Sequence, residues 1–128
     1  MKKPLFTRLL QYTFVGGGTF LIDLSLIYIL KTFLAAPDSL AIGLGFLTAI
    51  SINFIISYHF VFNGTKQTKS KGYIYFLTIA GAGLAVVTVG TLSISTTFGI
   101  SIYFARILIA GLVGLINFLL NNFFNFKM

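Results

Sequence analysis

Long apolar runs alternate with short polar segments along this 128-residue chain. A helix needs about 20 apolar residues to cross the hydrocarbon core of a membrane, and four runs reach that length. Because backbone groups in lipid must be satisfied within their own segment, each run predicts an α-helix. The expected spans are residues 12–33, 40–62, 73–96 and 102–126, with a polar loop over 63–72. The pattern predicts an all-α integral membrane protein whose single four-helix membrane domain covers residues 1–128.

The composition agrees with a membrane protein. Hydrophobic residues make up 57% of the chain and charged residues 9%, whereas a soluble domain carries about 25% charged residues. This argues against a soluble cytosolic enzyme and against a disordered chain. The absence of Cys removes disulfides, thiol nucleophiles and Cys-based zinc sites. One His and two acids leave little for a metal cluster, so we expect no metal and no cofactor.

The net charge of +7 lies in short basic clusters between the apolar runs, which is a membrane pattern and not a nucleic-acid-binding face. Seven basic residues fall on one side of the predicted membrane: Lys2, Lys3, Arg8, Lys66, Lys69, Lys71 and Lys127. The opposite side has at most Lys31. The positive-inside rule therefore predicts a multi-pass protein of the cytoplasmic membrane, with the loop and both ends of the chain in the cytoplasm.

An internal repeat appears when the sequence is shifted by 64 residues. Residues 53–62 then align with 117–126: an Asn, a Phe, two aliphatic residues, a small polar residue and two Phe coincide. The first and third runs match more weakly, with Tyr12 on Phe76. The alignment predicts two helical hairpins. Because each hairpin crosses twice, both should run in the same direction, as a parallel repeat about an axis along the membrane normal.

Two ionisable residues lie inside the predicted spans. Asp23 is near the middle of the first span, where a carboxylate costs about 2.5–3.5 kcal/mol on the insertion scale. Arg106 lies about one turn inside the outer end of the fourth span. One interpretation is a substrate-binding site in the outer half of the membrane, in which Arg106 meets an anionic group and Asp23 orients that group or bonds sugar hydroxyls. The other is a structural ion pair between the hairpins, and the sequence leaves both open.

Asparagines form a stripe on the fourth span, because Asn117, Asn121 and Asn125 are spaced four residues apart. Asn53 and Ser57 form the shorter equivalent on the second span. The stripes are typical either of a polar cleft for a lipid head group or of hydrogen bonds between membrane helices. The structural interpretation is favoured for Asn53, and the binding interpretation for Asn117 and Asn121.

The only histidine, His59, lies where the second span leaves the membrane. It is interpreted as an interfacial residue, with a phosphate contact as the alternative. A lone His without Cys or acids nearby does not make a metal site. The sequence offers no arrangement of nucleophile, base and orienting group, so we expect a protein that is not an enzyme.

These motifs resemble the GtrA-like membrane protein family. Residues 8–23 carry a basic residue, an aromatic, Val-Gly and then Asp, as in the opening of that family. Residues 117–121, followed by Phe124 and Phe126, resemble its closing motif. Arg106 falls where the family often has a basic residue. The resemblance covers essentially the whole chain.

The resemblance implies a role in glycosylating cell-surface polysaccharide or teichoic acid. Members are thought to move a polyprenyl-phosphate-linked sugar across the membrane, or to assist the glycosyltransferase that makes it. The implied partners are that lipid-linked sugar, membrane lipid, a membrane glycosyltransferase and a second copy of the chain. The family usually has two basic residues after its closing Asn, where this chain has Asn122-Phe123. His59, Asn122, Lys127 or the loop lysines must then supply any phosphate contact.

Three hypotheses follow. The first is a flippase for a lipid-linked sugar. The second is a scaffold that holds a membrane glycosyltransferase without transporting anything. The third is a small multidrug-type exporter, a class that also has four helices but typically carries a Glu in the first one, and not an Asp combined with an Arg. A cleft containing Arg106 would be positive, which argues against the export of cations.

Overall fold

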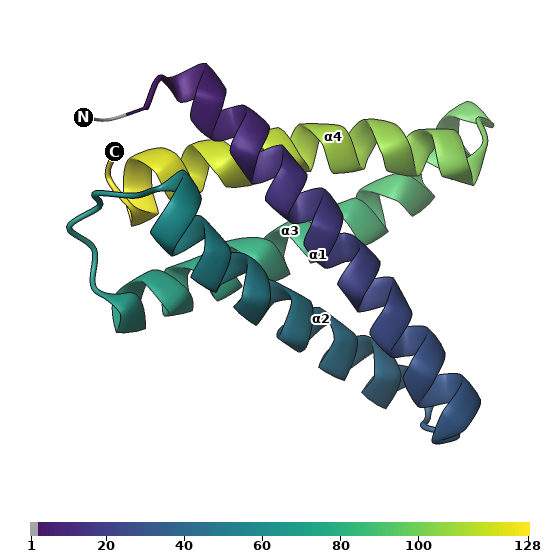
Figure 1. The fold of residues 1–128 in the computed structure, drawn as a ribbon. Coiled ribbons are helices and arrows are strands. Elements are labelled where there is room, and N and C mark those ends of the chain that lie inside the picture. Colours follow the sequence, from purple (N-terminus) through teal and green to yellow (C-terminus); the bar gives the residue numbers. More distant parts are fainter. Residues whose placement is uncertain (1–2) are drawn as a thin grey trace. The chain divides into compact units, whose positions relative to one another are not determined.

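The computed structural model describes residues 3–128, except for the side chains at positions 38, 39, 102, 103 and 106. Helices make up most of the described residues and no strand occurs among them, which confirms the all-α prediction (Figure 1). The elements are α1 (Leu5–Phe33), α2 (Asp38–Ile56), η1 (Ser57–Val61), α3 (Lys69–Phe98), α4 (Ile102–Leu120) and η2 (Asn121–Asn125). In the part of the chain that the structure describes, four helical stretches are long and apolar enough to cross a membrane, as the sequence predicts.

The chain divides into two compact units, Met1–Thr65 and Lys66–Met128. Each unit is a helical hairpin: α1 packs against α2 in the first, and α3 packs against α4 in the second. Figure 1 shows each hairpin as two long helices joined by a short turn at one end. We call these units the first hairpin and the second hairpin.

The first helix of each hairpin begins earlier than its apolar run. The helix α1 begins at Leu5, directly after Pro4, a residue type that suits the start of a helix. The helix α3 begins at Lys69, so Lys69 and Lys71 lie in its first turn and not in the expected loop. Thr68 caps this turn, because its hydroxyl accepts a hydrogen bond from the Lys71 N–H at 3.4 Å.

The second helix of each hairpin ends in a turn of π-helix, which the hydrophobic pattern does not predict. The Phe62 N–H donates to the Ser57 carbonyl at 2.8 Å, and the Phe126 N–H donates to the Asn121 carbonyl at 2.7 Å. Each bond reaches back five residues instead of four, so the turn is wider than in an α-helix. The two π turns are 64 residues apart and equally long.

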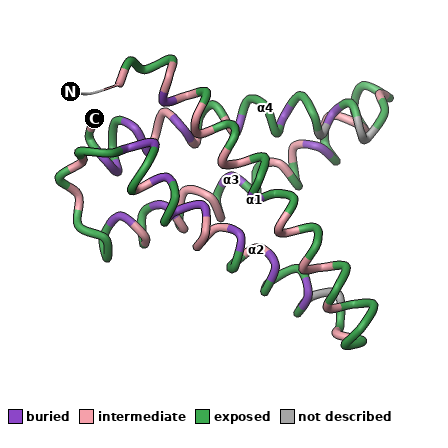
Figure 2. The backbone as a smooth tube through the Cα atoms, viewed as in Figure 1, coloured by how far each residue is buried: buried purple, intermediate pink, exposed green. Residues whose placement is uncertain are grey.

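Burial repeats with the same period. The bounds of α2 and η1, shifted by 64 residues, are those of α4 and η2. Figure 2 shows buried positions recurring along α2 and α4. Matched buried pairs are Ala41 and Ala105, Ala49 and Val113, Phe54 and Phe118, Ser57 and Asn121, and Phe62 and Phe126. The predicted repeat of two helical hairpins is therefore confirmed at the level of local structure.

An aromatic pair fixes the same end of each hairpin. The rings of Tyr12 and Phe62 lie edge to face, with centroids 6.2 Å apart. The matching rings of Phe76 and Phe126 are 6.4 Å apart. Such pairs contribute about 0.5–1.5 kcal/mol beyond their burial. Both π turns thus end on a phenylalanine that packs against the first helix of its own hairpin.

Large apolar side chains cover much of the helix surface in both hairpins. Figure 2 shows exposed residues along most of α1. Phe14 is 82% exposed, and Phe33 and Phe98 are each 72% exposed. Apolar surface on this scale is unusual in a soluble protein and suits contact with lipid tails. The exposed hydroxyls of Thr13, Ser25 and Thr88 each donate to the carbonyl four residues back on their own helix, so they leave little unsatisfied polarity on this surface.

Candidate functional site

Asp23 lies where α1 crosses α2. Its side chain is half-buried, and its Oδ1 atom is buried without a hydrogen-bond partner among the described residues. A Cβ atom added to Gly45 would lie 2.6 Å from this oxygen and 3.2 Å from the Asp23 carbonyl oxygen. The absence of a side chain at Gly45 therefore makes room for the carboxylate inside the first hairpin.

Asn53 and Ser57 bond within the first hairpin. The Asn53 amide donates to the Thr19 hydroxyl at 3.1 Å, which links α2 to α1. The Ser57 hydroxyl donates to Asn53 Oδ1 at 2.9 Å. Thr19 in turn donates to the Val15 carbonyl at 2.9 Å. This chain of buried bonds has the form of the structural interpretation that the sequence favours for Asn53.

The asparagine stripe of the second hairpin forms a ladder. The Asn121 amide donates to the Asn117 carbonyl at 2.9 Å, and the Asn125 amide donates to Asn121 Oδ1 at 2.9 Å. The Asn125 amide also donates to the Gly72 carbonyl at 3.0 Å, which joins the π turn to α3. Asn121 and Asn125 are fully buried, whereas Asn117 is half-buried and faces Gly83.

The two remaining predicted site residues lie elsewhere. His59 is exposed in the π turn η1, and its ring centroid is 5.1 Å from that of Tyr58. Arg106 belongs to α4, and its side chain lies outside the described residues. The structure thus brings together Asn53 with Ser57, and Asn117 with Asn121. Among the described residues, no group of three His, Asp or Glu side chains converges to hold a metal ion.

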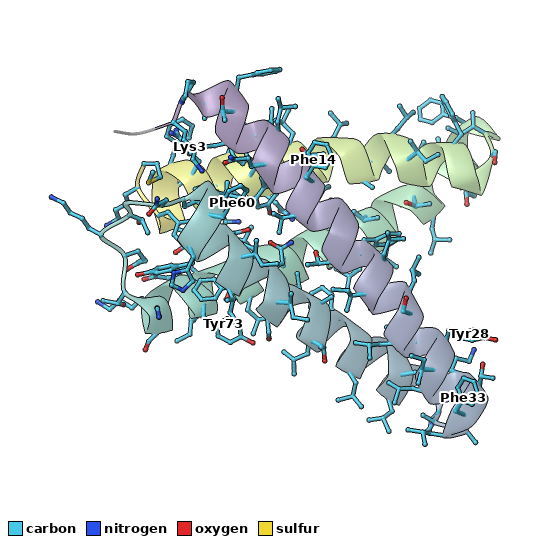
Figure 3. All side chains as sticks on the ribbon, in the orientation of Figure 1. Lys3, Phe14, Tyr28, Phe33, Phe60 and Tyr73 are labelled. Atoms are coloured by element: carbon cyan, nitrogen blue, oxygen red, sulfur yellow. The ribbon has the colours of Figure 1, made fainter. Side chains whose placement is uncertain are left out.

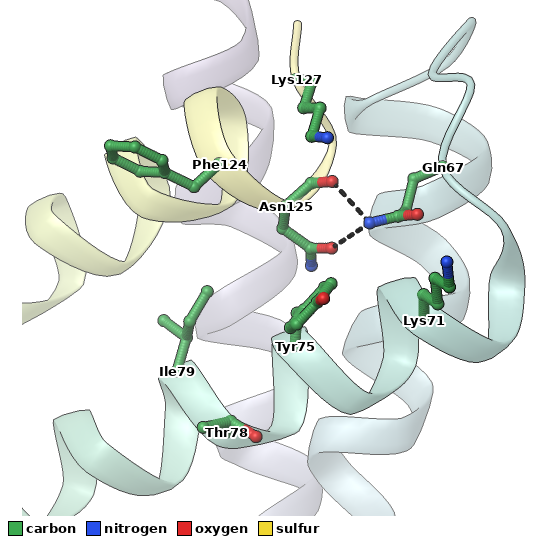
Figure 4. Close-up of a pocket in the computed structure, with 8 residues that line it drawn as sticks. All are labelled: Gln67, Lys71, Tyr75, Thr78, Ile79, Phe124, Asn125 and Lys127. Atoms are coloured by element: carbon green, nitrogen blue, oxygen red, sulfur yellow. Dashed lines mark hydrogen bonds between the residues drawn. The ribbon is translucent and has the colours of Figure 1, made fainter.

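A pocket with both polar and apolar lining in the second hairpin was missed as a site by the sequence analysis. It has a volume of about 330 Å³ and lies at the end of the hairpin where α3 begins (Figure 4). Its lining residues are Gln67, Lys71, Tyr75, Thr78, Ile79, Phe124, Asn125 and Lys127, and we call it the lysine pocket. The Gln67 amide donates to the Asn125 carbonyl at 2.9 Å, which closes one wall. The sequence signal was the pair of lysines, which were counted only for orientation or as substitutes for basic residues of the family.

Basic side chains of the first hairpin also take part in packing. Lys3 Nζ donates to the Phe60 carbonyl at 2.7 Å and to Gln11 Oε1 at 3.1 Å. The same ammonium lies 4.3 Å from the centroid of the Phe60 ring (Figure 3). Arg8 is buried and donates to the Lys3 carbonyl. These residues tie the start of α1 to the π turn η1.

The described residues include four apolar helices, and buried polar side chains form hydrogen bonds inside each hairpin. These features define a multi-pass helical membrane protein. The family model described as GtrA/DPMS, transmembrane domain, matches residues 11–126. The chain therefore belongs to this family, as the resemblance of its opening and closing motifs predicts. No curated protein and no solved structure gives a significant match. Membership supports a role in handling sugars linked to polyprenyl phosphate.

Proposed function

We propose that this protein moves a polyprenyl-phosphate-linked sugar from one leaflet of the cytoplasmic membrane to the other, without catalysing a reaction. Such a lipid carries an anionic phosphate and a hydroxyl-rich sugar, and neither group crosses hydrocarbon unaided. A protein that carries it needs polar groups at membrane depth while the lipid tail stays in the bilayer. The family match over residues 11–126 supports this substrate class.

The observation that carries the proposal is the carboxylate of Asp23. One of its oxygens is buried in a membrane-crossing hairpin and has no hydrogen-bond partner among the described residues. A polar atom buried without a partner costs free energy, and ionisable residues inside membranes are functional by default. In the proposal, Asp23 accepts hydrogen bonds from the sugar hydroxyls and Arg106 meets the phosphate.

The other proposed site residues take different roles. Asn117 faces Gly83 but is only half-buried, so in the proposal the accessible part of its side chain contacts the ligand. Asn53, Ser57 and Asn121 hold the helices that carry the site, because their recorded bonds stay within their own hairpins. His59, exposed at the helix end, contacts the phosphate as the lipid arrives. Four helices are too few to enclose the path of the sugar. A second copy of the chain, or a membrane glycosyltransferase, would complete the wall of that path.

Transport by the purified protein in liposomes tests the proposal. We expect Asp23→Leu to lower the rate of sugar-lipid transfer between leaflets by at least about tenfold, and Arg106→Gln to do the same, because each removes a polar contact that lipid does not replace. Ser25→Ala is the matched control, since Ser25 is exposed on the same helix and its hydroxyl bonds only to the Leu21 carbonyl.

Normal transfer by both site variants would reject the site. No transfer by the wild-type protein, together with recovery of a glycosyltransferase in a pull-down, would favour the scaffold hypothesis instead. Proton-coupled efflux of cationic dyes would favour the exporter.

A further inference from the structure

The lysine pocket contains positive charge that the second hairpin does not neutralise. Lys71 and Lys127 both line the pocket, and neither ammonium group has a hydrogen-bond or ion-pair partner among the described residues. The only two acids of the chain, Asp23 and Asp38, belong to the first hairpin. The second hairpin therefore has no acidic side chain of its own to pair with these lysines.

The wall between the two lysines is held rigidly. Asn125 is fully buried, and its amide donates to the Gly72 carbonyl at 3.0 Å and to Asn121 Oδ1 at 2.9 Å. The Gln67 amide donates to the Asn125 carbonyl at 2.9 Å. In Figure 4, Lys71 and Lys127 lie on either side of this amide pair and their ammonium groups point toward it. Two exposed lysines thus lie beside one preformed wall.

The backbone fixes the position of Lys127. Its φ angle is +52°, in the left-handed region that non-glycine residues rarely adopt. The N–H of the next residue, Met128, donates to the Asn122 carbonyl at 2.7 Å and closes the turn. The chain therefore reverses after the π turn η2, and this reversal places the lysine beside the pocket.

The first hairpin has a lysine at the position that corresponds to Gln67. Lys3 is the repeat equivalent of Gln67, and its ammonium bonds to Phe60 and Gln11 of its own hairpin. The first hairpin thus supplies a cation to its own π turn. In the second hairpin, the shorter and neutral Gln67 bonds the wall and adds no charge there.

The two pocket lysines are also specific to the second hairpin. Their repeat equivalents are Thr7 for Lys71 and Asn63 for Lys127, and neither carries a charge. The repeat is otherwise maintained at this end, in the π turns and in the aromatic pairs. At this end the second hairpin therefore has Lys71 and Lys127 around a pocket, where the first hairpin has Lys3 bonded to its own π turn.

The lining changes from polar to apolar along α3. Lys71 comes first, Tyr75 and Thr78 follow, and the aliphatic Ile79 lies about two turns beyond Lys71. The exposed ring of Phe124 adds a second apolar surface. A volume of about 330 Å³ is within the usual range for a pocket that holds a small ligand. The gradient fits a ligand with an anionic head and an apolar body.

We propose that the lysine pocket binds the phosphate group of an anionic lipid, with Lys71 and Lys127 as its two cationic contacts. Charge-assisted hydrogen bonds from two lysines suit a phosphate. The source of that phosphate is either a polyprenyl phosphate or an ordinary anionic phospholipid. The inference rests on the proposed function only for the first of these sources, since the charge and the lining argue for a phosphate lipid in either case.

Binding to the purified full-length chain in a neutral detergent tests this. The probes are farnesyl phosphate, farnesol, a short-chain phosphatidylglycerol and inorganic phosphate, each titrated by calorimetry. We expect farnesyl phosphate to bind at least about tenfold more tightly than farnesol, because the two differ only in the phosphate. Inorganic phosphate should bind more weakly than farnesyl phosphate, because it lacks the apolar body.

The variant Lys71→Thr/Lys127→Asn gives the pocket the residues of the first hairpin. We expect it to lower the affinity for farnesyl phosphate by at least about tenfold. Asn tolerates the left-handed backbone of position 127, so the fold should persist, and circular dichroism checks this. The matched control is Lys66→Gln/Lys69→Gln, which removes the same charge from exposed residues that do not line the pocket. Its affinity should stay within about twofold of the wild type.

Equal losses in both double variants would overturn the proposal, because they would show attraction to net charge alone. No binding of either phosphate lipid to the wild type would also overturn it. Tight binding of phosphatidylglycerol and not of farnesyl phosphate would assign the pocket to ordinary membrane lipid and support the proposal with that source. Binding without sugar-lipid transfer in liposomes would refute the proposed function alone, whereas transfer without binding would refute the pocket alone.

Discussion

The buried asparagines of the two hairpins make different kinds of hydrogen bond. Asn53 bridges the two helices of the first hairpin through Thr19, whereas Asn121 bonds along its own helix to the Asn117 carbonyl. Asn125 bonds to both α3 and its own helix. The hydrogen bond between Asn53 and Thr19 is thus a direct test of how much one polar contact contributes to a hairpin.

We expect Thr19→Val to lower the free energy of unfolding by about 0.5–1.5 kcal/mol, because interhelical hydrogen bonds in membranes average about 0.6 kcal/mol and reach about 1.7. Thr13→Val is the matched control. Thr13 lies on the same helix and bonds to the carbonyl four residues back, as Thr19 does, but it is exposed. Unfolding by denaturing detergent, followed by circular dichroism, gives both values. Equal losses would show that Asn53 contributes nothing across the hairpin.

The sequence shows which polar residues fall within the apolar spans, but not what they bond to. Asp23 and the asparagines stand out because each is costly in lipid. Their partners depend on how each helix is rotated, and these helices are apolar on nearly every side, so hydrophobicity does not reveal the rotation. The burial of Arg8 was missed for a related reason, since a basic residue beside an apolar run is normally assigned to the interface.

At the scale of the helix, a glycine allows the close contact between α1 and α2 in the first hairpin. A Cβ at Gly45 would lie 3.1 Å from Ile27 Cγ1 and 3.2 Å from the Asp23 carbonyl oxygen. A Cβ at Gly43, two residues earlier on the same helix, would meet nothing within 4 Å. The pair offers one crowded and one open position for the same substitution.

We expect Gly45→Ala to destabilise the protein by about 1–3 kcal/mol, because the added methyl group forces the backbones of α1 and α2 apart. Gly43→Ala should be neutral or stabilise by up to about 1 kcal/mol, since alanine is the better helix former. Detergent unfolding of the two variants measures both. If Gly45→Ala proved as stable as Gly43→Ala, the close contact at Asp23 would be absent.

The four membrane helices could be predicted well, but their ends could not. Hydropathy locates the apolar runs. The helix α1, however, begins at Leu5, seven residues before its expected span, and includes residues that hydropathy assigns to the interface. The two π turns also remained hidden, because a single wider turn changes no composition and little periodicity. The repeat was the stronger signal, since both hairpins place these turns at matching residues.

At the scale of the whole molecule, basic charge divides unevenly among the segments between helices. The link between α1 and α2 has only Lys31 nearby, and the link between α3 and α4 has no basic residue between Phe98 and Ile102. The segment between the hairpins carries Lys66 and is followed by Lys69 and Lys71. A parallel repeat therefore requires both hairpin links on one face of the membrane and the segment between the hairpins on the other.

Single cysteines locate these faces, because the chain has no cysteine and the wild type is a blank background. We expect Leu34→Cys and Thr97→Cys, both at exposed positions, to react with a membrane-impermeant maleimide in intact cells. Lys66→Cys should react only after the membrane is permeabilised, because the positive-inside rule retains its segment in the cytoplasm. The reverse pattern would invert the protein while keeping the parallel repeat. Reaction of Leu34→Cys and Thr97→Cys from opposite faces would contradict the repeat itself, since one hairpin would then cross the membrane in the other direction.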